Sequence, residues 1–176
     1  SVAPQFQGFV NDVPVDADAS AIRLVASYTD RGRDAIPSLT GQASVTLRSR
    51  TIQAEAADEY RGTQPLGSSR AEGNTFMGAI NHNGFLKFAD IDLSRVNTIE
   101  IQAASAGAGG TIEVRFGAFN GPVLGSTPVE VNGDWEAFST KVIKLTPTTD
   151  RGDLYFVFQN EQNTGGLMNV DSISFQ

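Results

Sequence analysis

Apolar and polar residues alternate along much of this chain. Ile99, Ile101 and Ala103 are separated by polar residues, and the apolar positions of 112–116 follow the same spacing. Successive side chains of a strand point to opposite faces, so this pattern predicts antiparallel strands with one buried face. No segment shows the helical periodicity over about ten residues that a helix of average length would need.

The alternating segments are short and are separated by turns rich in Gly, Asn and Asp. Strands of this length and spacing predict an all-β fold, a β-sandwich or jelly roll of antiparallel strands. The expected strands are 22–28, 43–48, 51–56, 76–80, 85–88, 98–104, 111–118, 123–124 with 129–131, 137–144, 154–159 and 168–175.

The organisation changes near residue 50. Residues 1–50 are too few to fill a core alone, and they contain two expected strands around a loop rich in charges and glycine. We interpret them as a β-hairpin extension or linker, the end of an upstream module. Residues 51–176 form the main β-sandwich module.

The composition excludes several classes of partner. The formal net charge is −7 and the sequence pI is about 4.6, which argues against nucleic acid and against anionic membranes. The chain has no cysteine, so disulfides do not stabilise it. Neutral polysaccharides and divalent cations remain compatible with this acidic balance.

The sequence contains few groups that could catalyse a reaction. His82 is the only histidine and lies in an expected turn, and no nucleophile-elbow, zinc-protease or P-loop motif is present. Carboxylate pairs for glycoside hydrolysis are unavoidable among 20 acidic residues, so they indicate little. Residues 151–153 match an adhesion tripeptide, but such short matches arise easily, and we interpret them as a charged turn before a strand. We expect no enzymatic activity.

Several segments occur in the order found in one known family. They are Ile52–Glu55, Asn83–Phe88, Asp90–Leu93, Ala103–Arg115, Gly121–Gly125, Asn132–Glu136, Asp153–Phe158 and Met168–Phe175. Together they make residues 51–176 resemble the carbohydrate-binding modules of family 6. The resemblance implies a jelly-roll fold and polysaccharide binding beside a catalytic domain.

The resemblance also implies a sugar site among the loops at one end of the sandwich. Trp135 matches one ring of an aromatic pair that clamps a sugar, and Asn169 matches an amide that hydrogen-bonds it. Ala79 stands where the second ring is usual, which departs from the family pattern; Tyr60 and Phe76 are the neighbouring aromatic alternatives. The structural alternative for Trp135 is a turn residue that caps the core.

Some family members have a second sugar site on the concave face of one sheet. Phe85 matches its aromatic residue and Glu113 matches a carboxylate there. Glu113 alternates with Ile112 and Val114, so it faces away from the core. The alternative for Phe85 is a core residue.

A structural calcium ion is the cofactor that the resemblance implies. Gln53 and Glu55 are two positions apart on an expected strand, so both would point to one face. With Asp171 and backbone carbonyls of 70–74 they supply the oxygen donors that calcium prefers. The alternative is a solvated acidic strand.

These interpretations lead to one expected function and two rivals. We expect a secreted or extracellular bacterial module that binds β-linked plant or algal glycans, as a monomer, for a catalytic domain of the same protein. One rival is a structural or adhesion sandwich that has lost its sugar site, which Ala79 favours. The other is a small hydrolase completed by residues 1–50.

Overall fold

The computed structural model describes residues 21–32 and 37–176. Contacts divide the chain into two units, Ser1–Leu47 and Arg48–Gln176. In the first unit, β1 (Ala21–Thr29) and β2 (Thr40–Arg48) form a two-stranded sheet. At its turn, Asp30 Oδ1 accepts hydrogen bonds from the amides of Gly32 and Leu39. The predicted hairpin is therefore present, and residues 1–20 of the predicted extension lie outside the described residues.

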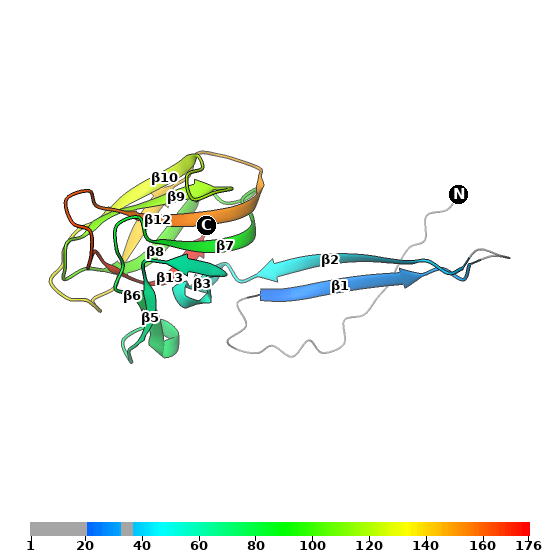
Figure 1. Cartoon of the computed structure of the whole chain (residues 1–176), viewed down its shortest axis with the longest axis horizontal. Helices are drawn as coiled ribbons and strands as arrows, with labels where there is room; N and C mark the ends of the chain where they lie inside the picture. The colour runs from blue at the N-terminus through cyan, green and yellow to red at the C-terminus, as the bar shows by residue number, and fades with distance from the viewer. Residues whose placement is uncertain (1–20, 33–36) are drawn as a thin grey trace. The chain divides into compact units, whose positions relative to one another are not determined.

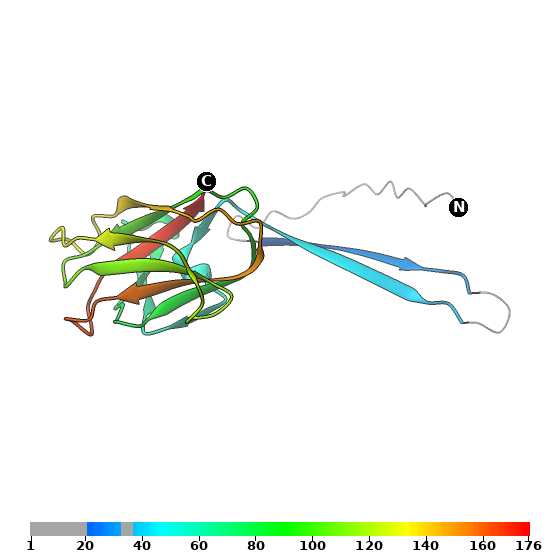
Figure 2. The same cartoon turned by 90° about the horizontal axis from the view of Figure 1, so that it is seen from above.

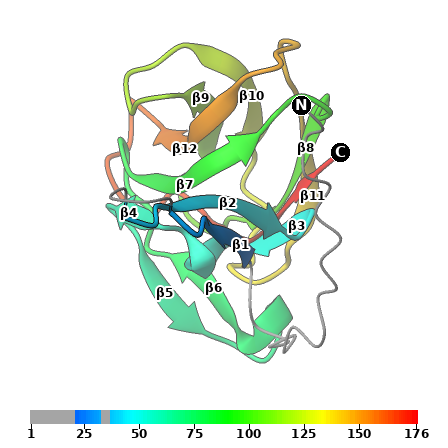
Figure 3. The ribbon, with the colours of Figure 1, turned by 90° about the vertical axis from the view of Figure 1, so that its right-hand side faces the viewer.

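The second unit consists of two antiparallel sheets (Figure 1). One sheet has the strand order β10-β9-β12-β7-β4 and the other the order β11-β8-β13-β6-β5, with β3 also paired to β13. Figure 3 shows the strands of both sheets from one end. The elements are β3 (Thr51–Gln53), η1 (Ala54–Ala56), β4 (Glu59–Arg61), β5 (Gln64–Gly67), η2 (Glu72–Asn74), β6 (Thr75–Gly78), β7 (Phe85–Asp92), β8 (Thr98–Ala104), β9 (Gly110–Phe116), β10 (Val123–Val129), β11 (Ser139–Lys144), β12 (Arg151–Gln159) and β13 (Asn169–Phe175).

The side chains between the two sheets form the core. Phe88 on β7 and Phe156 on β12 pack edge to face with ring centroids 5.8 Å apart, and both are buried. Ile99 and Ile101 of β8 face them from the other sheet and are also fully buried. Each such side chain contributes roughly 1.5–3 kcal/mol of hydrophobic stabilisation. The apolar positions of the alternating pattern are the residues that line this core. The predicted all-β jelly-roll sandwich is therefore confirmed.

Connections that pass from one sheet to the other meet at one end of the sandwich, which we call the loop end. They join β4 to β5, β6 to β7, β8 to β9, β10 to β11 and β12 to β13. Backbone hydrogen bonds connect them in series, as from Asn81 to Gly62, from His82 to Thr164, from Ala108 to Gly166 and from Asn132 to Ser105. Main-chain hydrogen bonds therefore hold these loops to one another. Figure 2 shows the connections gathered at one end of the sandwich.

Several expected strands differ from the structure in their bounds. β7 extends to Asp92 and β12 begins at Arg151, so the expectation of a charged turn at 151–153 was wrong. The expected strand 51–56 ends at Gln53, and Ala54–Ala56 form a 3₁₀ turn, η1. The expected pieces 123–124 and 129–131 are one strand, β10, with a bulge between Val123 and Gly125. β10 is at the edge of its sheet, where the missing N–H of Pro128 is tolerated.

Two short strands were not expected at all. β4 and β5 lack clear alternation, and they form because β7 and β6 offer them a sheet edge. Within the described residues, no helix is long and apolar enough to cross a membrane.

Candidate functional site: the loop end and an oxygen-lined pocket

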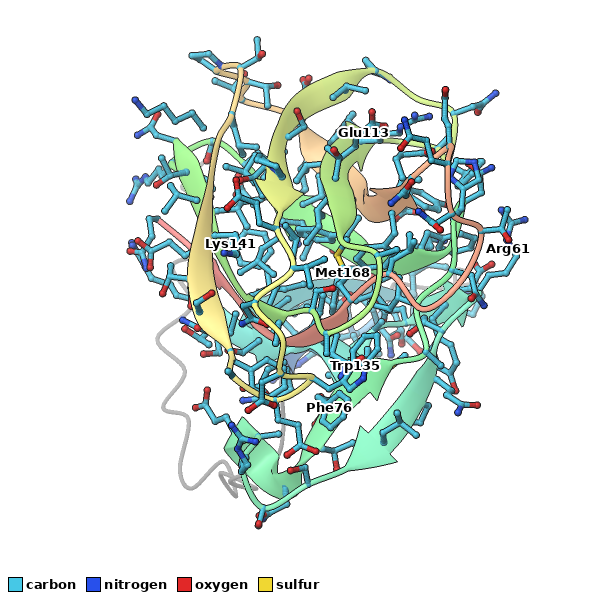
Figure 4. The ribbon with its side chains drawn as sticks, turned by 90° about the vertical axis from the view of Figure 1, so that its left-hand side faces the viewer. Arg61, Phe76, Glu113, Trp135, Lys141 and Met168 are labelled. Carbon is cyan, nitrogen blue, oxygen red and sulfur yellow. The ribbon has the colours of Figure 1, made fainter. Side chains whose placement is uncertain are left out.

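Trp135 lies in the β10–β11 connection at the loop end (Figure 4). Its side chain is 40% exposed, so part of the indole ring is open to solvent. The other part lies close to the backbone of Gly107 and Gly166 in neighbouring loops. A large apolar ring held on a rigid surface is a suitable platform for the apolar C–H face of a sugar.

Gly107 allows this close approach because it has no side chain. A Cβ atom at this position would collide with the carbonyl oxygen of Gly166 and with Cη2 of Trp135. We therefore expect Gly107→Ala to displace the ring and to cost about 1–3 kcal/mol, as overpacking does. Urea unfolding and the emission of Trp135 would measure both effects.

Gly67→Ala is the matched control for that substitution. A Cβ at Gly67 would make only an ordinary contact, 3.8 Å from the carbonyl oxygen of Asn74. An unchanged Trp135 emission in Gly107→Ala would show that the ring does not depend on this glycine.

Asn169 is the first residue of β13 and binds the backbone of Trp135. Its side chain is buried, and its Nδ2 donates a hydrogen bond to the backbone carbonyl of Trp135 over 2.8 Å. Its Oδ1 lies toward Gly78, where an added Cβ would be 3.0 Å away. The structure thus brings the two predicted sugar-binding residues into contact, with the amide fixing the backbone that presents the ring.

No second ring faces Trp135 from the position of Ala79. Ala79 is exposed and adopts a left-handed backbone with φ of 52°. Phe76 is 4% exposed and packs edge-on against Phe138, so its faces are not free. Tyr60 is exposed but lies on β4, in the five-stranded sheet, whereas Ala79 follows β6 of the other sheet. The platform at the loop end is therefore one-sided.

A second aromatic group covers the outer face of the five-stranded sheet. This outer-face cluster consists of Phe85, Phe119, Tyr155, Arg61 and Arg115. Phe85 is only 5% exposed, because Phe119 from the β9–β10 connection packs on it with centroids 5.7 Å apart. The guanidinium of Arg61 lies 5.1 Å from the centre of the Phe85 ring.

Glu113 lies on the same outer face and is already paired. Both Nε and Nη2 of Arg115 donate hydrogen bonds to its Oε2. The prediction that Glu113 faces away from the sandwich core agrees with this geometry, and Phe85 lies outside the core cluster. Sugar binding there by Phe85 and Glu113 stays a prediction, and it would require the covering side chains to move.

Three buried oxygen atoms lie together where β3, η1 and β13 meet. Gln53 Oε1, Glu55 Oε2 and Asp171 Oδ1 have no hydrogen-bond partner among the described residues. We call Gln53, Glu55 and Asp171 the oxygen pocket. Buried polar atoms without partners are costly and rare, so three such oxygens make a set that a cation could satisfy.

The negatively charged forms of the two carboxylates in the oxygen pocket are disfavoured by their surroundings. Burial raises the pKa of Glu55, and the nearby charges of Asp171 and Glu72 raise it further. Burial also raises the pKa of Asp171, with a further contribution from the charge of Glu72. None of the ion pairs in the described part of the chain involves Glu55 or Asp171.

The η2 turn closes this pocket. The amide of Glu72 donates to Asp171 Oδ2 over 3.2 Å, and Gly73 lies beside the side chains of Glu55 and Gln53. No group of three or more His, Cys, Asp or Glu side chains in the described ranges could hold a metal. The donors here are instead two carboxylates, an amide oxygen and nearby carbonyls, which is the mixed oxygen set that suits calcium.

One surface depression lies at the opposite end of the sandwich. It is lined by Leu93, Asn97, Pro147 and neighbouring small side chains, without an aromatic ring. This lining offers no platform for a sugar ring, so the loop end is the better candidate.

A comparison with known families agrees with this geometry. The family model described as carbohydrate binding module (family 6) matches residues 53–176, well over half of the chain. The chain belongs to carbohydrate-binding module family 6. This family binds carbohydrate and is not catalytic. The resemblance inferred from the sequence is therefore confirmed.

Solved structures of other family 6 modules are similar to this one. A β-1,3-glucan-binding module from Bacillus halodurans is 32% identical with a TM-score of 0.66, over 72% of this chain and 94% of that chain. A module from Clostridium cellulolyticum in complex with xylose is 26% identical with a TM-score of 0.66, over 72% and 95%. A module from Cellvibrio mixtus lichenase 5A in complex with cellotriose is 25% identical with a TM-score of 0.60, over 72% and 95%.

No pattern in the sequence indicated the residues that hold the loops of this family 6 module in place. Arg70 makes two hydrogen bonds to Asp134, the residue before Trp135, and Phe119 covers Phe85. Neither residue stands in a spaced motif, because each contact joins segments far apart in sequence. The two-residue spacing used to group Gln53 with Glu55 assumed a continuous strand, which was wrong. Glu55 lies in the η1 turn, and both side chains lie beside Gly73.

Proposed function

We propose that this family 6 module binds a β-linked plant or algal polysaccharide through Trp135 at the loop end. The exposed indole is the observation that supports this most directly. Asn169 fixes the backbone of Trp135 and two glycines lie beside its ring, while solvent reaches the rest of the ring. A sugar ring would stack on it, and its hydroxyls would bond to the polar groups of the surrounding loops. Similar modules bind β-1,3-glucan or were solved with xylose or cellotriose, which favours β-linked glucans and xylans.

In this proposal the module acts for an attached enzyme. The related Cellvibrio module comes from a lichenase, which supports this arrangement. Binding to an insoluble glycan would raise the effective concentration of a linked catalytic domain at its substrate. We propose a secreted or extracellular location for the same role, because polymeric glycans are met outside the cell, and a bacterial source like that of the similar modules from Bacillus halodurans and Clostridium cellulolyticum. The module itself would act as a monomer without nucleic-acid or membrane partners.

Affinity electrophoresis against a panel of glycans tests the proposal. Laminarin, a mixed-linkage β-glucan, cellulose oligosaccharides and xylan should be compared with an α-glucan as the negative control. We expect retardation by at least one β-linked glycan and none by the α-glucan. Retardation by none would favour the rival role, a structural or adhesion module that lost its site, for which the one-sided platform at Ala79 is the supporting observation. Release of reducing ends would instead indicate a hydrolase.

Substitutions on the outer face separate the two candidate sugar sites. Phe119→Ala removes the ring that covers Phe85 and leaves Trp135 untouched. If the loop end is the binding site, this variant should keep its glycan affinity within about twofold, since distant sites act independently. A large loss, or a gain from uncovering Phe85, measured by titration calorimetry would place the binding on the outer face.

We further propose that the oxygen pocket holds a structural calcium ion. Glu55 and Asp171 would supply carboxylate oxygens, Gln53 an amide oxygen, and residues 70–74 backbone carbonyls. Three buried oxygens without partners in the described residues support this assignment. The ion would supply positive charge and oxygen coordination, and would thereby join β3, η1 and β13 around η2.

A further inference from the structure

Residues Ser68–Asn74, which we call the linking segment, contact both candidate sites. At one end the amide of Glu72 donates to Asp171 Oδ2, and Gly73 lies beside Glu55. At the other end Ser68 Oγ donates to Glu136 Oε2 over 2.6 Å. The linking segment therefore spans from the oxygen pocket to the loop that presents Trp135.

Arg70 makes the stronger of the contacts to that loop. Its Nη1 and Nη2 donate to Asp134 Oδ1 and Oδ2 over 3.2 and 2.9 Å. A two-point pair of this kind fixes orientation as well as distance. The bond to Asp134 raises the pKa of Arg70, and the bond from Arg70 lowers the pKa of Asp134, so both groups stay charged at neutral pH.

The two residues held by the linking segment flank Trp135 directly in the sequence. Asp134 precedes the ring and is bound by Arg70, and Glu136 follows the ring and is bound by Ser68. Asp134 Oδ1 also accepts a hydrogen bond from the amide of Glu136 over 2.8 Å, which closes the backbone around Trp135. A displacement of the linking segment would therefore change the placement of the indole.

The linking segment is closed by its own hydrogen bonds. The amide of Ser68 donates to the carbonyl of Asn74 over 2.9 Å, and the amide of Asn74 donates to the carbonyl of Ala71 over 3.1 Å. The amide of Arg70 donates to Ser68 Oγ over 3.0 Å. A closed loop moves as a unit, so a change at Glu72 and Gly73 reaches Ser68 and Arg70.

β13 provides a second connection between the same sites. Asp171 belongs to the oxygen pocket, and Asn169, two residues earlier on the strand, donates to the carbonyl of Trp135. This connection runs through a buried strand and is expected to be stiff. The linking segment is on the surface, so it is the part whose position the charges of the oxygen pocket can change.

We propose that Arg70 is a positioning residue that couples the oxygen pocket to Trp135, so that calcium binding strengthens sugar binding. The inference rests on the proposed cation and sugar sites and goes beyond them by linking the two. Without a cation, the like charges of Glu55, Asp171 and Glu72 would repel one another, which would weaken the contact from the amide of Glu72 to Asp171 and favour an outward displacement of η2. Neutralising them favours the closed position of the linking segment, in which Arg70 and Ser68 hold both neighbours of Trp135.

Thermodynamic linkage sets the size and symmetry of this coupling. If calcium raises the sugar affinity by some factor, the sugar must raise the calcium affinity by the same factor. The Arg70–Asp134 pair is exposed, and exposed ion pairs contribute little, so we expect a factor of roughly two to five. Salt screens such pairs, so the factor should shrink at high ionic strength.

Trp135 provides the readout, because it is the only tryptophan in the chain. Calcium chloride is titrated into the chelator-treated full chain at low ionic strength, and the emission of Trp135 is recorded without any sugar. We expect a saturable change in emission. In a second arm, a β-1,3-gluco-oligosaccharide and a xylo-oligosaccharide are titrated with calcium and with chelator, and affinity should fall roughly two- to fivefold in chelator.

Arg70→Ala should keep the stabilisation by calcium but lose the emission change and the calcium dependence of sugar affinity. Arg70→Lys should restore part of both, since it keeps the charge without the two-point geometry. Arg151→Ala is the matched control, because it breaks another exposed arginine–aspartate pair, Arg151 to Asp90, and should behave as wild type.

Each result decides between the proposals. Calcium that stabilises the chain without changing Trp135 emission, or an emission change that survives in Arg70→Ala, would overturn the coupling and leave the cation site standing. Absence of calcium binding in calorimetry would overturn the cation site and the coupling together, and would leave sugar binding standing. If neither oligosaccharide binds, the emission arm alone still decides whether Arg70 connects the oxygen pocket to Trp135.

Discussion

Trp135→Ala should reduce affinity for the bound glycan by about 30-fold or more, because losing a central aromatic anchor costs about 2 kcal/mol or more. The ring is the exposed aromatic surface of the loop end, and Ala79 supplies no second ring that would keep part of the stacking. The measurement is titration calorimetry with whichever glycan the electrophoretic panel identifies. Trp135→Phe should keep an intermediate affinity, since a smaller ring retains part of the contact.

Stability measurements on the same variants separate lost contact from lost fold. Trp135 is 40% exposed, so its truncation should lower the melting temperature only slightly. Val131→Ala, at an exposed position in the same β10–β11 connection, is the matched control and should bind as wild type. A Trp135→Ala variant that folds and binds normally would exclude the loop end as the sugar site.

Asn169→Ala should resemble Trp135→Ala in binding but differ in stability. It leaves the carbonyl of Trp135 without its 2.8 Å donor at a partly buried position, so a stability loss of about 1 kcal/mol should accompany the weaker binding.

Removing calcium from the calcium-saturated protein should lower its melting temperature by about 5–10 °C. A ligand at about 100 times its dissociation constant contributes about 2.7 kcal/mol, and each kcal/mol shifts the melting temperature by a few degrees in a unit of this size. The physical reason is the set of buried oxygens at Gln53, Glu55 and Asp171 that lack partners in the described residues. Differential scanning calorimetry with calcium and with a chelator measures the shift.

Asp171→Asn provides a sharper test, because the expected effect changes sign with the ion. In chelator the variant should be as stable as wild type or more so, since a buried carboxylate near Glu55 and Glu72 is removed. With calcium it should be less stable, since a charged oxygen ligand is lost. Asp92→Asn is the control, because it removes an exposed carboxylate at the C-terminal end of β7, away from the oxygen pocket. Equal melting temperatures with and without calcium in the wild type would exclude a stabilising ion.

Alternation along the chain predicted the sheets because it reflects burial, which is a local property of each strand. Ile99, Ile101 and Ala103 face the core in the structure as their spacing indicates. The ordered segments also identified the family, since they preserve the turns and core positions of one fold. Trp135 and Asn169 came from that likeness, and the structure places them in contact.

Contacts between distant segments could not be predicted in the same way. The turn at η1, the covering of Phe85 by Phe119 and the pairing of Glu113 with Arg115 depend on which loops meet across the sandwich. Spacing on an assumed strand grouped Gln53 with Glu55 for a reason that was wrong, although both side chains do lie beside Gly73.

By itself, then, the sequence determined an antiparallel sandwich, its family and the residues from which a sugar site and an oxygen pocket can be built. Only the tertiary structure decided that the outer-face aromatic residue is covered, that the loop-end platform is one-sided, and that Ser68–Asn74 connects the oxygen pocket to Trp135. The physical reason is that burial patterns repeat with the geometry of one strand. Hydrogen bonds and ion pairs between loops depend on where the folded backbone places their ends.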